Sequence, residues 1–208
     1  MFMFVISSAI INNIKNTRKE MGSLAAYFYF HFNVNSKRDL RGLLASLLFQ
    51  LCDSSDRCRN VLHELYKICN DGSERPSDAA LTWCLKKMLN LPGQLPIFII
   101  MDALDECPST TGTPAARDEV LDIVEDLVGS NHSNLFICVT SRPEQDIQTI
   151  LNPLTSPSCR IPARRKWSNG GYQRLCSFFC QTDRAMRRWR EEDKELVINA
   201  LSERAGGM

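Results

Sequence analysis

The sequence lacks several patterns that would assign it at once to a functional class. No apolar run approaches the about 18 residues needed to cross a bilayer, so we expect no membrane span. No C-x-x-C pair occurs among the nine cysteines, and there are only three histidines, so we expect no zinc site. Cysteines that are odd in number and scattered are typical of buried free thiols in a reducing compartment. We therefore expect a cytoplasmic protein.

The sequence also lacks a basic stripe of the kind that binds nucleic acid. From Arg160 onward there are 11 basic and 6 acidic residues, although the whole chain has a formal net charge of only +1. The basic clusters in this tail lie next to Trp167 and Trp189, but acidic residues follow the second cluster at once. A solvated helix face explains the pattern better than nucleic-acid binding, which requires basic residues interleaved with stacking aromatics.

Apolar strands and helical periodicities alternate along the chain. We expect strands at residues 23–32, 95–101 and 134–140, a short edge strand at 158–163, and helices at 7–19, 40–51, 61–69, 77–89 and 120–128. Continuous apolar strands separated by helices predict an α/β fold with a parallel sheet and helices on both faces. We assign residues 1–163 to this domain and residues 164–208 to a helical C-terminal segment.

The segment LPIFIIMDALDEC places three carboxylates directly after a buried strand. Asp102 stands at the strand end, with Asp105 and Glu106 following within five positions. This is the Walker B type of pattern, in which the first acid serves Mg²⁺ and a later acid orients or deprotonates a water. The alternative is a strand end whose acids cap the next helix or face water.

A second polar strand end lies about thirty residues further on. The apolar stretch NLFICVT ends in Thr140, Ser141 and Arg142. Because functional groups of parallel sheets gather at the carboxyl ends of strands, we expect Arg142 to lie close to the Asp102–Glu106 cluster, where a cation would sense phosphate. The alternative for Arg142 is a surface cation or a salt bridge to Asp102 or Glu106.

Four blocks of sequence together resemble the NACHT-type nucleoside triphosphatase domain of fungal receptor-like proteins, which often carry ankyrin repeats. These blocks are AAYFYFHFN…DLRGLLASLLFQLC, PIFIIMDALDEC, NLFICVTSRPEQDI and MRRWREEDKELVINALSERAGGM. The resemblance implies a signalling ATPase that uses ATP and Mg²⁺ to switch between a closed monomer and an open oligomer. It implies that Asp102 serves the metal, that Asp105 and Glu106 serve the hydrolytic water, and that Arg142 is the first sensor. Thr140 is implied as a cofactor-binding residue.

The sequence departs from this family in one essential motif. A P-loop needs G-x-x-x-x-G-K-[ST], whose backbone amides cradle phosphates, and the 208 residues contain no such stretch. We expect that the first strand and its loop are cut off, and that the chain also stops early at the other end. Because that strand would normally be central, the remaining strands should flank a gap with exposed apolar edges. Weak ATP binding, marginal stability and self-association should follow.

Two other functions stay open at this point. One is a non-catalytic interaction module that keeps the surface of the domain and pairs with intact NACHT relatives. The other is a metal-dependent phosphohydrolase that uses Asp102, Asp105, Glu106 and His31.

Overall fold

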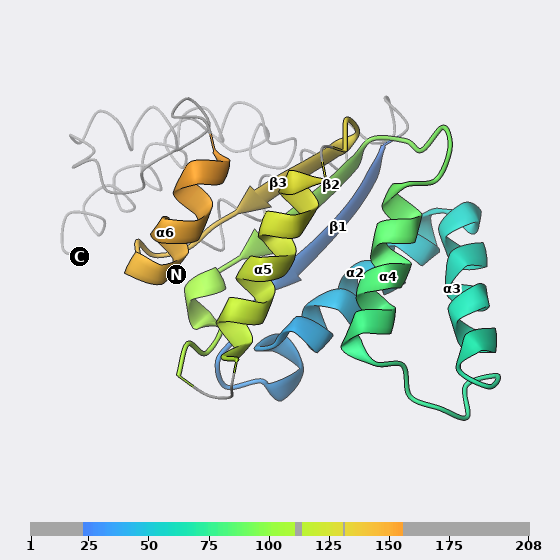
Figure 1. Ribbon diagram of the computed structural model, residues 1–208, viewed down its shortest axis with the longest axis horizontal. Helices are drawn as coiled ribbons and strands as arrows, with labels where there is room; N and C mark the ends of the chain where they lie inside the picture. The colour runs from blue at the N-terminus through green and yellow to red at the C-terminus, as the bar shows by residue number, and fades with distance from the viewer. Residues whose placement is uncertain (1–22, 111–113, 131, 156–208) are drawn as a thin grey trace, which may run out of the picture. The chain divides into compact units, whose positions relative to one another are not determined.

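The computed structural model describes residues 23–110, 114–130 and 132–155 (Figure 1). The expected helix at 7–19, the edge strand at 158–163, the domain boundary at 163 and the helical tail lie outside the described residues. The described elements, in chain order, are β1 (Leu24–Tyr29), η1 (Asn35–Lys37), α2 (Leu40–Ser54), α3 (Asp56–Ile68), α4 (Asp78–Leu89), β2 (Ile97–Asp102), η2 (Leu104–Glu106), α5 (Ala116–Gly129), β3 (Leu135–Val139) and α6 (Gln145–Leu154).

The three described strands form one parallel sheet in the order β1-β2-β3. β1 is paired with β2 from Leu24 opposite Ile97 to Tyr29 opposite Asp102. Each crossover between strands contains a helix, as parallel pairing requires. The expected α/β class, with a parallel sheet flanked by helices, is confirmed.

The expected gap beside a missing strand does not fall between the described strands. β2 and β3 pair directly, in register from Ile97 opposite Leu135 to Met101 opposite Val139. Direct pairing satisfies backbone N–H and C=O groups that a gap would have left without partners, so the two strands close together. The carboxyl ends of all three strands consequently lie at one edge of a continuous sheet.

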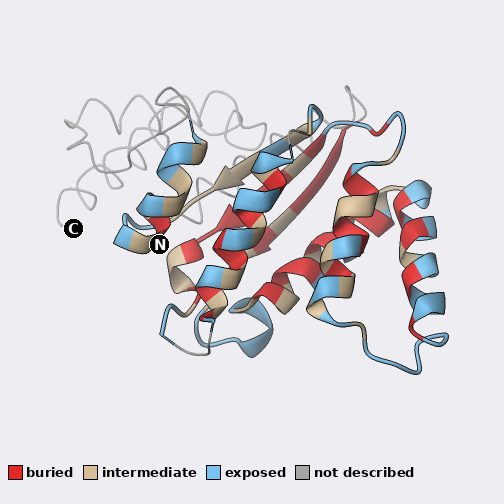
Figure 2. Cartoon of the chain, in the orientation of Figure 1, coloured by how far each residue is buried: buried red, intermediate tan, exposed pale blue. Residues whose placement is uncertain are grey.

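One face of the sheet forms the hydrophobic core together with the helices. Alternate residues of the strands belong to this core, beginning with Leu24 on β1 and Ile97 on β2. The leucines of α2, the helix expected at 40–51, are buried there from Leu40 to Leu51, and α5 adds Val120 to Leu127 (Figure 2). Strands bury every second residue and helices bury residues at a spacing of about 3.6, so both kinds of element left a recognisable apolar pattern in the sequence.

Helices α2, α3 and α4 each begin at a residue whose side chain caps the helix, and Ser55 is the cap of α3. Ser77 caps α4, since its side chain accepts a hydrogen bond from the backbone N–H of Ala80. Helix α2 begins in the same way. Asp39 itself is the cap and accepts from Gly42 N at 2.8 Å, whereas Ser36 lies in η1.

Among the described helices, none combines the length and apolar character that crossing a bilayer demands.

Helix α6 was not among the expected elements. It is only ten residues long and contains Pro153, and the segment before it contains Pro143, so its periodicity is short and interrupted. Ile147 is buried in the core and fixes the helix to the rest of the fold. The segment after β3 therefore returns to the same core instead of leaving it.

Candidate functional site

The candidate site begins with Asp102, which ends strand β2. Only 1% of Asp102 is exposed, because the strand is central and its last residue remains within the sheet. The Thr140 hydroxyl, which follows β3, donates a hydrogen bond to Asp102 Oδ1 and accepts one from Ala103 N at 3.1 Å. The structure thus brings together the two residues that the sequence nominated for cofactor binding.

The chain turns sharply directly after Asp102. Ala103 has φ of 56° and ψ of 47°, a left-handed conformation that a residue with a Cβ adopts only at a cost. Leu104 N then donates to Thr140 O at 3.0 Å, which ties the turn to the neighbouring strand end. The turn leads at once into η2, which carries Asp105 and Glu106.

Arg142 lies against the carboxylate of Asp105. Its backbone N–H donates to Asp105 Oδ1 at 3.0 Å, and its Nε is 3.0 Å from Asp105 Oδ2. The Asp105 side chain is 6% exposed, while that of Arg142 is 71% exposed. The expected proximity of Arg142 to the acidic cluster is confirmed, and the partner is Asp105, where the sequence had offered Asp102 or Glu106.

Glu106 reaches toward the end of β1. Its Oε2 accepts a hydrogen bond from Phe32 N at 3.4 Å. His31, the fourth residue of the phosphohydrolase alternative, instead makes local contacts: its Nδ1 accepts from Asn33 N at 3.2 Å and its ring stacks on Phe32. Within the described ranges, no group of three or more His, Cys, Asp or Glu side chains is placed to hold a metal ion. The phosphohydrolase alternative stays a prediction, and the His31 contacts that the structure shows are local.

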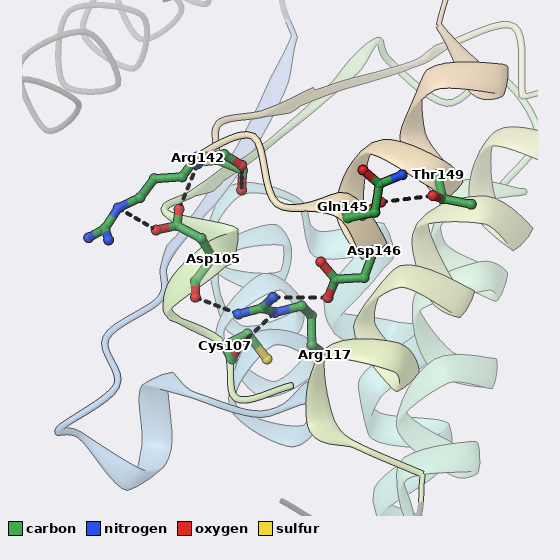
Figure 3. A network of polar contacts seen from close by, with 8 residues as sticks. Asp105, Cys107, Arg117, Arg142, Gln145, Asp146 and Thr149 are labelled. Atoms are coloured by element: carbon green, nitrogen blue, oxygen red, sulfur yellow. Dashed lines mark hydrogen bonds and ion pairs between the residues drawn. The ribbon is translucent and has the colours of Figure 1, made fainter. Parts of the chain in front are cut away.

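Sequence reasoning missed Arg117 and Asp146, which join the same network (Figure 3). Arg117 is 7% exposed and forms an ion pair with Asp146, with 2.9 Å between Nη1 and Oδ2. A signal was present, because Arg117 lies three and four positions before Val120 and Leu121, on the apolar face of α5. A charged residue at a core-facing position needs a buried partner.

Electrostatics in the network follow from burial and from Arg117. Partial burial would raise the pKa of Asp146, but the hydrogen bond and charge of Arg117, with the Ile147 backbone N–H, outweigh it and lower that pKa from 3.8. Burial raises the pKa of the Cys107 thiol to about 12, against the opposing charge of Arg117. Of the described cysteines, all are free and only Cys138 is not fully buried, as the sequence predicted.

The donors at the strand end fit Mg²⁺ better than they fit a nucleotide. Mg²⁺ usually takes one or two carboxylates and fills its other positions with water and substrate phosphates. Asp102, supported by Thr140, is such a carboxylate, and the ion would supply charge neutralisation beside a phosphate group. The backbone amides that would bind the phosphates of a nucleotide are not supplied in the usual way, because the 208 residues contain no G-x-x-x-x-G-K-[ST] stretch.

Fold and site together define a parallel α/β domain with acidic and basic strand ends, an arrangement compatible with the P-loop type of domain. The chain belongs to the family described as Nephrocystin 3, N-terminal, whose model matches residues 4–142, more than half of the sequence. That family stands in place of the NACHT family suggested by the sequence blocks, although the region is compatible with a NACHT-like fragment. No curated protein and no solved structure matches the chain.

Proposed function

We propose that the chain is the part of a NACHT-type signalling ATPase that carries the metal-binding and sensor strand ends. In this proposal the whole protein is a nucleotide-dependent switch of the kind found in fungal receptor-like proteins, and it associates with itself or with related NACHT proteins. The observation that carries the proposal is the meeting of Asp102, Asp105 and Arg142 at the carboxyl edge of one parallel sheet. Open α/β sheets bind ligands at this edge.

The proposed roles follow from what each side chain contacts. Asp102 is rigidly held by the sheet and by Thr140, which suits a metal-binding carboxylate. Within the described part of the chain, the Glu106 carboxylate accepts one hydrogen bond, from Phe32 N at 3.4 Å, so it is the less restrained candidate for orienting a water. Asp105 is occupied by Arg142, so it would act on a water only after Arg142 turned toward a phosphate.

The second candidate, a non-catalytic interaction module, is favoured by the lack of a G-x-x-x-x-G-K-[ST] stretch in the 208 residues, whose described strands nevertheless form a continuous sheet. A chain with this sheet keeps the surface of the domain without its phosphate cradle. Such a module would act by pairing with an intact relative.

Binding of labelled ATP with Mg²⁺ distinguishes the two functions. We expect the 208-residue chain to bind weakly or not at all, because its backbone offers no glycine-rich cradle. A version carrying G-x-x-x-x-G-K-S and its strand ahead of residue 1 should gain Mg²⁺-dependent binding if the strand ends serve a nucleotide. Failure of that version to bind would reject the ATPase proposal in favour of the module. Sub-micromolar binding by the chain alone would contradict the assigned role of the missing motif.

A further inference from the structure

The guanidinium of Arg117 joins two segments that meet again at the candidate site. Its Nε donates to Cys107 O at 2.8 Å and its Nη2 donates to Asp105 O at 2.7 Å, so two of its bonds hold the segment that carries the acidic pair. Its Nη1 pairs with Asp146 at 2.9 Å, on the segment that follows β3 (Figure 3). One side chain therefore fixes both segments.

These contacts form a closed loop that runs from Arg117 through the Asp105 and Arg142 segments and back to Arg117. Arg117 binds the backbone carbonyl of Asp105, and the carboxylate of Asp105 binds both the N–H and the side chain of Arg142. Four residues further on, Asp146 returns to Arg117 at the start of α6. The distance between the Asp105 segment and the Arg142 segment is thereby set at two points, one inside the fold and one at its surface.

Arg117 is suited to this task in a way that a lysine would not be. The guanidinium presents donors in a rigid planar fork, so it can hold two carbonyls and a carboxylate in fixed directions. A lysine would keep the charge beside Asp146 but would be a compact, mobile donor. Arg117 is also only 7% exposed, so its hydrogen bonds to the two backbone carbonyls are largely shielded from solvent.

We propose that Arg117 is a positioning residue for the candidate site: it holds the η2 turn against the segment after β3, so that the Asp105 carboxylate is presented to Arg142. The functional meaning of this role rests on the proposed function, since it matters through Asp105 and Arg142. Arg117 itself does not touch the reacting groups. Without it, the strands would remain paired while the acidic turn lost its fixed place beside the sensor.

Amide hydrogen exchange of the 208-residue chain tests the proposal without any nucleotide. The Arg142 N–H donates to the Asp105 carboxylate and so reports where that carboxylate lies. In Arg117→Lys and Arg117→Ala we expect Arg142 to exchange about tenfold faster or more, the equivalent of losing one hydrogen bond to a charged acceptor. Asp105→Ala defines the full loss of protection.

Two internal comparisons separate positioning from general destabilisation. The Thr140 N–H donates to Met101 O at 2.9 Å within the sheet and should keep its protection in the same variants. Arg59→Ala removes an exposed arginine that pairs with Asp56 far from the site, and should change neither amide. If Arg117→Ala fails to fold, Arg117→Lys decides the question.

Unchanged Arg142 protection in a folded Arg117 variant would overturn the proposal, as would equal loss at Arg142 and Thr140. Absence of Arg142 protection in the parent chain would overturn it too. The proposed function fails separately, through the ATP binding test. Loss of Arg142 protection in Arg117→Lys, together with failure of the cradle-bearing version to bind ATP, would leave the positioning role standing while rejecting the ATPase.

Discussion

Asp146 is the residue whose titration reports most directly on the contacts around Asp105. Its pKa is lowered from 3.8 because Arg117 and the Ile147 N–H outweigh partial burial. A carboxyl with a depressed folded-state pKa stabilises the fold above its unfolded-state pKa, and that contribution is lost as pH falls through the folded-state value. The stabilisation should therefore be complete at neutral pH, begin to decline near pH 3.8, and vanish only once the pH falls below the lower folded-state value.

Asp146→Asn tests this pH dependence. We expect the variant to be less stable than the parent at neutral pH, because Arg117 loses its charged partner, and the two should converge as pH falls below 3.8. Urea unfolding followed from pH 7 to pH 2.5 measures the difference between the two unfolding free energies. A difference independent of pH would show that Asp146 acts through shape alone.

The sequence indicated the site residues that follow strands and missed those that hold them. Asp102, Thr140 and Arg142 were readable because apolar runs end directly at or just before them. The partner of Arg142 was not readable, since the left-handed turn at Ala103 decides which carboxylate faces Arg142. Arg117 and Asp146 are 29 positions apart, and only the fold brings them together.

At the scale of elements, the start of α2 depends on a glycine. A Cβ at Gly42 would lie far inside contact distance of the Ser36 carbonyl oxygen, a backbone atom of η1 that cannot move aside cheaply. The same glycine donates its N–H to the capping Asp39. The tight crossing of η1 over the first turn of α2 therefore requires the absence of a side chain.

Gly42→Ala should destabilise the fold by about 1 to 3 kcal/mol despite the higher helix propensity of alanine, because the added methyl group must displace backbone. Gly129→Ala is the matched control: Gly129 ends α5, and a Cβ there would meet nothing within 4 Å. That control should be neutral or stabilise by up to about 1 kcal/mol. Urea unfolding of both variants measures the contrast, and equal effects would refute the crowding at η1.

Elements with a long periodic or apolar pattern were predicted from the sequence. A short element whose position depends on the residues it packs against was missed. The leucine series of α2 and the apolar run of β2 were long enough to be recognised alone. Helix α6 was missed because its ten residues include Pro153 and only Ile147 is fully buried. The pairing of β2 with β3 agrees with the expected closeness of their carboxyl ends, although strand order depends on which edges meet and not on either strand's own pattern.

At the scale of the whole molecule, one parallel sheet orders the site. Its core lies between one sheet face and helices α2, α4 and α5, and its carboxyl edge gathers the acids of β2 and the cation after β3. Three carboxylates lie at or just after the end of the apolar strand β2, and because this strand is buried in the sheet it holds the segment that carries them in place. Membership of the Nephrocystin 3, N-terminal family covers this same region.

The central claim is that the strand-end carboxylates serve a metal-bound nucleotide, and the most direct test separates binding from turnover. In the version that carries a phosphate-binding loop, Asp102→Asn should weaken Mg²⁺-dependent ATP binding and turnover together. Glu106→Gln should leave binding largely intact and slow single-turnover hydrolysis on the order of 10² to 10⁴, since an amide cannot take a proton from water. If both variants bind and hydrolyse ATP like their parent, the acids after β2 are only the polar end of a strand and the account is wrong.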